Sequence, residues 1–261
     1  MTVFRRPSMK AATVFGAAAV VLAGLVAVSL IVLAPRVGSD APAPARSPGP
    51  DYALPVEPPP TVAELPLEGV SGYADPGWVA RVSAASGIPV RALDAYAGAA
   101  IAKARVMPSC GLGWTTLAAI GLVESDHGRH GGSTVGEDGT VTPPIFGVAL
   151  DGSSSAHIPD SDGGLVDGDA EYDRAVGPMQ LIPQTWRNWH TDGNRDGVED
   201  PQNIYDAVNA TSNYLCRASG DMVSRDGWRA GVLAFNDSAA YVQSVANAAN
   251  RYAKDAATAG N

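Results

Sequence analysis

The side chain best placed for chemistry is Glu124, at the end of an apolar helical pattern. Leu117, Ile120, Gly121 and Glu124 stand at positions i, i+3, i+4 and i+7, which share one face of a helix. The rest of that face is apolar, so desolvation would disfavour the carboxylate and raise the pKa of Glu124. A general acid needs that environment, because it must carry a proton near neutral pH. The spacing predicts an acid/base at Glu124; the alternative is a Glu that ends a helix and points to solvent.

A second motif, AVGPMQLIPQTW over residues 175–186, combines a turn, a polar side chain and flat rings. Its Gly-Pro pair sets a turn, and Pro183 can begin a new helix. Between them, Gln180 offers both amide donor and acceptor groups. Trp186 and the nearby Trp189 supply flat apolar surface that suits sugar rings or the core, and we expect core packing for at least one of them.

Residues 192–206, DGNRDGVEDPQNIYD, begin like a calcium loop of the EF-hand type. Oxygen-bearing side chains stand at loop positions 1, 3 and 5, and Gly197 at position 6 permits the sharp turn. Position 12, usually a bidentate Glu, is Asn203, so a longer loop would close at Asp206. The predicted ligands are Asp192, Asn194, Asp196, the carbonyl of Val198, and Asp206, with Asp200 contributing through water. The alternative is a solvated Asp/Gly turn that binds nothing. We expect no organic cofactor.

The N-terminal part predicts an exported chain held at a membrane. Residues 11–34 carry no charge, and about 20 apolar residues span a bilayer. Basic residues precede this run, so residues 1–10 are expected to stay cytoplasmic and the rest to lie outside the cell membrane. The alternative is a cleaved signal peptide, whose apolar region is usually about 7–15 residues. We expect residues 35–74 to form a Pro-rich linker, because the nine prolines between positions 42 and 66 favour extended backbone.

Charge and cysteine content restrict the partners and the covalent structure. The net charge of −9 argues against a nucleic-acid binder, which would need a basic face. Cys110 and Cys216 are the two cysteines, and an even pair in an exported chain predicts a disulfide. Closing so long a loop is worth roughly 4–5 kcal/mol in the chain-entropy model. The alternative is two unrelated buried thiols.

Helical patterns dominate residues 75–261. We expect a short helix from Pro76, helices over 90–106 and 112–125, and further helices near Pro183 and over 204–217, 228–235 and 239–254. Residues 126–173 are rich in Gly and Asp and predict irregular structure, with 140–150 as the best strand candidate. The acidic stretch 151–173 fits no metal template and is expected to form a flexible loop. The sequence therefore predicts one mostly α domain with a long Gly/Asp-rich insertion.

Four segments in this order resemble the membrane-bound lytic murein transglycosylase B family, in its actinobacterial branch. They are AIGLVESDHGRHGG, AVGPMQLIPQTW, DGNRDGVEDPQNIYDA and AFNDSAAYV, and the resemblance covers roughly residues 75–252. It implies a lysozyme-like α+β fold with a groove for peptidoglycan glycan strands. It also implies cleavage of the β-1,4 bond between N-acetylmuramic acid and N-acetylglucosamine, with a 1,6-anhydro product. Calcium loops of the extended kind occur in this family.

The resemblance carries over to individual positions. Glu124 matches the family's single acid/base, and Gln180 matches a Gln that borders the cleft. Tyr214 matches an aromatic that faces substrate, while Asn236 and Tyr241 match an Asn and a Tyr near the catalytic Glu. For the two tyrosines the alternative is core packing with a satisfied hydroxyl. Phe235 is a departure, because a Tyr is common there, and it removes a hydroxyl.

Two other functions stay open on the sequence. Asp126, Asp169, Glu171 and Asp173 offer a second carboxylate, so a hydrolytic muramidase that uses a carboxylate pair is an alternative. A peptidoglycan-binding module without chemistry is another, although the retained Glu124 and Gln180 argue against it. Protein partners are left open.

Overall fold

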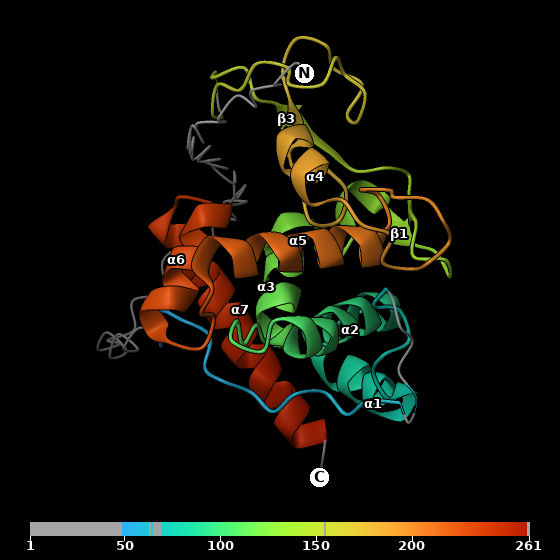
Figure 1. Ribbon diagram of the computed structural model, residues 1–261, viewed down its shortest axis with the longest axis vertical. Coiled ribbons are helices and arrows are strands. Elements are labelled where there is room, and N and C mark those ends of the chain that lie inside the picture. The colour runs from blue at the N-terminus through green and yellow to red at the C-terminus, as the bar shows by residue number, and fades with distance from the viewer. Residues whose placement is uncertain (1–48, 63, 65–68, 154, 260–261) are drawn as a thin grey trace, which may run out of the picture.

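The computed structural model describes residues 49–62, 64, 69–153 and 155–259. Within them the chain is mostly helical, as predicted, with seven α-helices and two small antiparallel sheets (Figure 1). The predicted cytoplasmic N-terminus (1–10) and anchor (11–34) lie outside the described residues. Among the described helices, none has both the length and the apolar character needed to cross a bilayer.

The elements follow the predicted helices closely. The first three helices are α1 (Pro76–Ser86), α2 (Val90–Val106) and α3 (Trp114–Ser125). Short strands follow: β1 (Thr134–Val135) pairs with β2 (Val141–Thr142), and β3 (Phe146–Ala149) pairs with β4 (Arg174–Val176). The last four helices are α4 (Pro183–Trp189), α5 (Ile204–Ser219), α6 (Arg225–Phe235) and α7 (Ala239–Ala259). The remaining chain between β3 and β4 forms loops.

Local signals explain where α1 begins and ends. The Asp75 side chain accepts a hydrogen bond of 2.7 Å from the Trp78 N–H, and Pro76 occupies the first helical turn. Gly87 ends the helix with φ of 74°, a left-handed conformation that costs glycine little. These features account for the agreement between the predicted and observed bounds.

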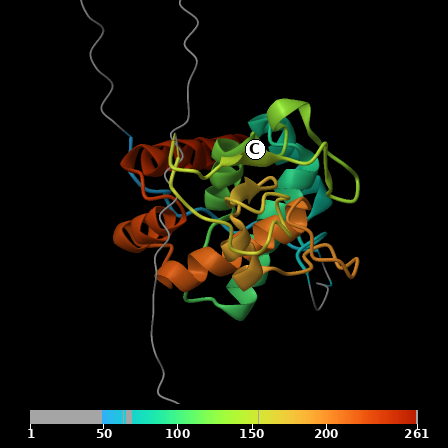
Figure 2. The same cartoon turned by 90° about the horizontal axis from the view of Figure 1, so that it is seen from above.

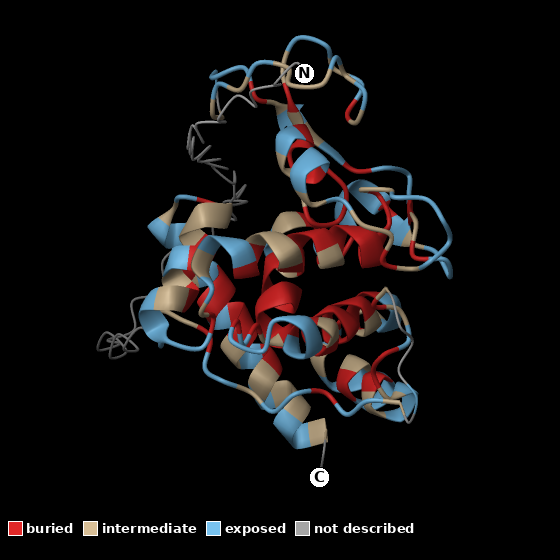
Figure 3. Cartoon of the chain, in the orientation of Figure 1, coloured by how far each residue is buried: buried red, intermediate tan, exposed pale blue. Residues whose placement is uncertain are grey.

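Helix α3 lies at the centre of the core. All residues from Trp114 to Gly121 are buried, so the helix is covered on every side rather than along one apolar face as predicted (Figure 3). It packs against α2 and α7. Gly121 is needed for the α2 contact, because a Cβ there would lie 2.0 Å from the Tyr96 hydroxyl oxygen. Only the last turn of α3 emerges from this core, and that turn carries Glu124.

Helix α5 joins the two ends of the helical body. It packs against α2 and α6, which lie on opposite sides of the molecule in Figures 1 and 2. The small sheet β3–β4 and α4 lie beyond α5 from α1 and α2 (Figure 1). The Gly/Asp-rich insertion therefore forms a separate layer of loops and short strands over the helices.

Part of the predicted linker packs on the helical domain. Asp51 forms ion pairs with Arg225 (2.6 Å) and Arg229 (2.9 Å) on α6. The Asn250 side chain on α7 accepts from the Leu54 N–H at 2.8 Å and donates to the Tyr52 carbonyl at 2.9 Å. Residues 49–62, which we call the strap, thus add to the folded unit that was expected to start near Asp75.

The predicted disulfide is confirmed. Cys110, just before α3, is bonded to Cys216 in the last turn of α5, with the two Cα atoms 5.5 Å apart. Both residues are buried. The bond ties the segment that leads into the central helix to the helix that carries Tyr214.

Candidate functional site

Glu124 and Tyr241 are brought together from helices that are 117 positions apart in the sequence. Glu124 lies in the last turn of α3, and Tyr241 lies in the first turn of α7. The Tyr241 hydroxyl donates a hydrogen bond of 2.5 Å to Oε1 of Glu124. Glu124 is half-buried, whereas Tyr241 is 8% exposed. The carboxyl group is therefore held by a buried phenol while keeping access from outside.

The environment raises the proton affinity of Glu124. Burial raises the pKa of its carboxyl to about 7, and the hydrogen bond from Tyr241 acts in the opposite direction. A carboxyl with this pKa is substantially protonated near neutral pH and can act as an acid and then as a base. The direction agrees with the prediction made from the apolar surroundings of Glu124.

A row of four aromatic rings leads to this carboxyl group. Phe235 at the end of α6 stacks on Tyr241 with ring centroids 6.4 Å apart and an interplanar angle of 18°. Tyr214 contacts Phe235 at 6.0 Å, and Trp189 contacts Tyr214 at 6.3 Å. Trp189, Tyr214 and Phe235 are each half-buried, so the row keeps part of its surface exposed. We call these four residues the aromatic row.

Phe235 belongs to the candidate site, although the sequence assigned it no polar role. Its missing hydroxyl excluded a polar role, but its ring joins Tyr241 to Tyr214. The two tryptophans divide as expected, because Trp186 is buried at 6% exposure and Trp189 belongs to the row. The Tyr214 hydroxyl donates to the Ala234 carbonyl at 2.5 Å, so its ring rather than its hydroxyl is available.

Asn236 carries an unusual buried acceptor. It directly follows Phe235 and is 2% exposed. Its Oδ1 atom is buried and has no hydrogen-bond partner among the described residues. An unsatisfied buried acceptor costs about 1–3 kcal/mol, and a donor from a bound ligand would recover that cost.

Gln180 is held by the turn that contains it. Its backbone has φ of 47°, a left-handed conformation that is uncommon for a residue other than glycine. The side-chain Nε2 donates to the Gly177 carbonyl at 2.9 Å. Gly177 has φ of 74° and approaches Pro201 so closely that a Cβ would lie 1.8 Å from the Pro201 carbonyl oxygen.

Ser125 ties this turn to the helix of Glu124. Its hydroxyl donates to the Pro178 carbonyl at 2.6 Å and accepts from the Gly128 N–H at 2.8 Å. The turn and the end of α3 are therefore fixed to each other one residue from Glu124. Gln180 is linked to the Glu124 region through this contact, and no direct bond between the two side chains is observed among the described residues.

His127, to which the sequence assigned no role, fixes the chain after Glu124. It is 1% exposed, and its ring nitrogens bond the hydroxyls of Tyr96 on α2 (3.1 Å) and Tyr252 on α7 (2.8 Å). Burial lowers the pKa of His127 to about 4, so the ring is neutral at neutral pH. The chain turns here through two left-handed residues, Asp126 and His127.

In the predicted calcium loop, the carboxylates of Asp192 and Asp206 accept hydrogen bonds from backbone N–H groups of the same loop. Asp192 accepts backbone N–H bonds from Arg195, Asp196 and Gly197. Asp206 is fully buried and accepts from the N–H groups of Gly193, Asn194 and Asp200, while burial raises its pKa to about 6. This bonding fits a solvated turn as well as a cation loop.

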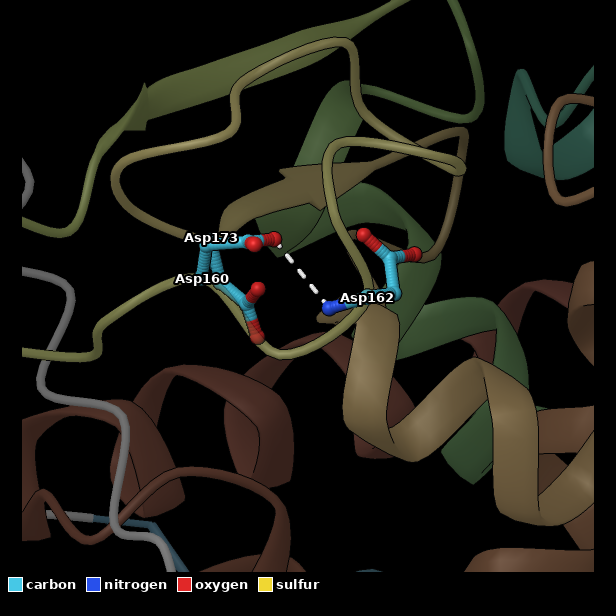
Figure 4. Close-up of side chains that lie close together, drawn as sticks. All are labelled: Asp160, Asp162 and Asp173. Carbon is cyan, nitrogen blue, oxygen red and sulfur yellow. Dashed lines mark hydrogen bonds between the residues drawn. The ribbon is translucent and has the colours of Figure 1, made fainter.

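A different group of acidic side chains has its carboxylate oxygens close together. Ligand oxygens of Asp160, Asp162 and Asp173 lie within 4.8 Å of one another, the one such set of three found in the described residues (Figure 4). The Asp162 N–H bonds Oδ1 of Asp160 at 3.1 Å, and the Asp173 carboxylate bonds the backbone and hydroxyl of Ser161. The acidic side chains of the loop at 192–206 do not form a set of three with oxygens that close, so calcium binding there stays a prediction.

Calcium binding has a direct test. If the loop binds calcium, 1 mM CaCl₂ should raise the melting temperature, because a ligand at about 100 times its Kd adds roughly 2.7 kcal/mol of stability. Asp192→Asn should abolish that shift, whereas Asp160→Asn should leave it unchanged. A melting temperature that does not differ between calcium and chelator would contradict the prediction, and the reverse mutant pattern would move the ion to the Asp160 group.

Comparison with known proteins adds no family to these observations. No family model, no curated protein and no solved structure matches the chain.

Proposed function

We propose that this protein is a peptidoglycan lytic transglycosylase in which Glu124 is the single acid/base. The observation that carries the proposal is the half-buried Glu124 carboxyl, with its pKa near 7 and its hydrogen bond from Tyr241. The aromatic row beside it supplies the flat surface that sugar rings stack on. The predicted export of the domain and the motif resemblance agree with a cell-wall polymer as substrate.

The first step is proton donation to the leaving group. Protonated Glu124 gives its proton to the glycosidic oxygen while the bond from that oxygen to C1 breaks, and the bonding electrons stay with the oxygen. The positive charge at C1 is stabilised by the substrate's own N-acetyl group. The Tyr241 hydroxyl stabilises the new Glu124 carboxylate, because it already donates to Oε1.

In the second step Glu124 acts as the base. The carboxylate takes the proton of the C6 hydroxyl while that oxygen forms a bond to C1. This closes the 1,6-anhydro ring and returns Glu124 to its protonated state without consuming water. Three of the four sequence candidates for a second carboxylate are engaged elsewhere: Asp126 pairs with Arg129, Asp169 pairs with Arg174, and Asp173 bonds Ser161. A single-carboxyl mechanism needs no such partner.

Product mass separates the proposal from its alternatives. Purified peptidoglycan sacculi treated with the full-length protein should release muropeptides with an anhydro end. That end is lighter by about 18 Da, the mass of one water, than a hydrolysed end. Release of hydrolysed ends would assign a muramidase instead. Binding to sacculi with no soluble product would assign a non-catalytic module.

Tyr241→Phe should move the pH profile in a known direction. The hydrogen bond from Tyr241 lowers the pKa of Glu124, so its removal raises that pKa further. Because Glu124 enters the reaction protonated, the alkaline limb of kcat/KM should shift to higher pH while kcat falls about tenfold or more. A limb that stays in place would show that another group controls it. Tyr172→Phe, which removes a hydroxyl from the Gly/Asp-rich insertion, is the control and should leave the profile unchanged.

A further inference from the structure

A hollow between α2 and α5 is lined by residues that the proposed reaction does not use. Its volume is about 600 Å³, and none of Glu124, Gln180 or the aromatic row lines it. The residues that matter below are Lys103, Arg105, Thr191, Asp192, Asn209 and Asn213. The volume falls within the range of about 300–1,000 Å³ that is typical of small-molecule sites.

Lys103 is a buried cation with few partners. It is 7% exposed, and in the described part of the chain its partner is Oδ1 of Asn213. An ammonium group has three donors, so this one bond leaves two donors without an acceptor among the described residues. No ion pair among the described residues includes Lys103. Burial lowers its pKa, as expected for a charge that has lost water without gaining a counter-charge.

The other lining groups favour an anion of low charge. Arg105 adds a second cation and lies over the Tyr73 ring, 5.9 Å from its centroid. Among the described lining residues Asp192 is the acidic one, and its carboxylate is already bonded to three backbone N–H groups of its own loop. The Lys103 ammonium is thus the charge on which the assignment rests, and a single ammonium suits a monoanion better than a dianion.

Neutral polar side chains also line the hollow. Asn213 accepts from Lys103, and the Asn209 amide donates to the Thr191 hydroxyl at 3.2 Å. Amide and hydroxyl groups of this kind bond the amides of a peptide, while an ammonium pairs with a carboxylate. We propose that this hollow binds a carboxylate, either of a small acid or of a peptide C-terminus, with the Lys103 ammonium as its charged contact.

Calorimetric titration of the full-length protein tests the proposal. The probes are N-acetyl-dialanine, its C-terminal amide, acetate and inorganic phosphate. We expect saturable binding of the acetylated dipeptide or of acetate, and loss of binding in the C-terminal amide, which lacks the charge. Binding of the dipeptide alone identifies a peptide terminus, and equal binding of acetate identifies a small acid. Binding of phosphate alone, or of no probe, would overturn the proposal.

Variants at Lys103 locate the site. Lys103→Met keeps the length of the side chain and should weaken binding about tenfold or more, the value of a charge-assisted hydrogen bond. Arg217→Met removes an exposed cation from α5 and is the matched control, which should bind as the parent does. Equal affinity of Lys103→Met and the parent would contradict the assignment.

Chemical modification of the parent protein gives the same answer without a mutation. The chain has three lysines, at positions 10, 103 and 254, and Lys254 is exposed on α7. The bound dipeptide should slow acetylation of Lys103, measured by peptide mass spectrometry, and leave the rate at Lys254 unchanged. Equal rates at Lys103 with and without the ligand would argue against contact. This outcome is independent of glycan cleavage, so it tests the hollow separately from the proposed function.

Discussion

Replacing Glu124 by Gln should lower the rate of glycan cleavage by about 10²–10⁴-fold, the usual contribution of a general acid. Gln keeps the shape of the side chain but has no proton to give to the glycosidic oxygen. The measurement is release of soluble muropeptides from purified sacculi at equal protein concentration. Glu137→Gln removes the same charge from an exposed position and should cleave at the parent rate. Equal activity of Glu124→Gln and the parent would exclude Glu124 as the acid.

At alkaline pH the same variant should be more stable than the parent protein. The pKa of Glu124 is about 7 in the folded chain and 4.5 ordinarily, so its contribution to stability is present below 4.5 and lost as the pH rises through 7. Gln cannot ionise, so Glu124→Gln should melt at a higher temperature than the parent at pH 8. An inactive variant that melts higher would show that the loss of activity is chemical and not a failure to fold.

His127 acts on stability in the opposite direction. Its pKa is about 4 in the folded chain and 6.5 ordinarily, so its contribution is present above 6.5 and lost as the pH falls through 4. In the parent, the two groups therefore oppose each other between about pH 4.5 and 6.5. In Glu124→Gln only the effect of His127 remains, so the melting temperature of this variant should rise with pH between about 4.5 and 6.5.

Removal of the disulfide should have the largest effect on stability. Cys110 and Cys216 are 106 positions apart, and cross-linking a loop of that length is worth about 4–5 kcal/mol in the chain-entropy model. The double variant Cys110→Ala/Cys216→Ala should therefore melt about 10–15 °C lower, at roughly 2–4 °C per kcal/mol for a domain of this size.

The reductant provides the control for that variant. Dithiothreitol should lower the melting temperature of the parent toward that of the double variant and leave the double variant unchanged. A double variant that melts within about 2 °C of the oxidised parent would show that the bond contributes little to stability, as happens when the reduced chain retains structure.

Features with local causes could be predicted from the sequence. The bounds of α2 follow from periodicity between Pro89 and Pro108, and α1 follows from Asp75, Pro76 and Gly87. The disulfide followed from the even number of cysteines in a chain that was expected to be exported. In each case the information lies within a few residues or in a simple count.

Contacts between distant segments could not be predicted in the same way. Tyr241 bonds Glu124 across 117 positions, and Ser125 bonds Pro178 across 53. In the acidic group, Asp160 and Asp162 are two positions apart, but Asp173 joins them only because the chain folds back just before β4. No loop template describes that spacing. The surroundings of α3 were underestimated for the same reason, because burial on its far side depends on α2 and α7.

The strap limits how far the folded domain can lie from a membrane that holds the predicted anchor. Asp51 is paired with α6, so the chain is attached to the domain from about residue 50 rather than residue 75. If residues 11–34 are the anchor, only residues 35–48 remain to separate the two. A fully extended chain of that length spans at most about 50 Å. The proposed enzyme would then reach only the layer of wall polymer nearest the bilayer.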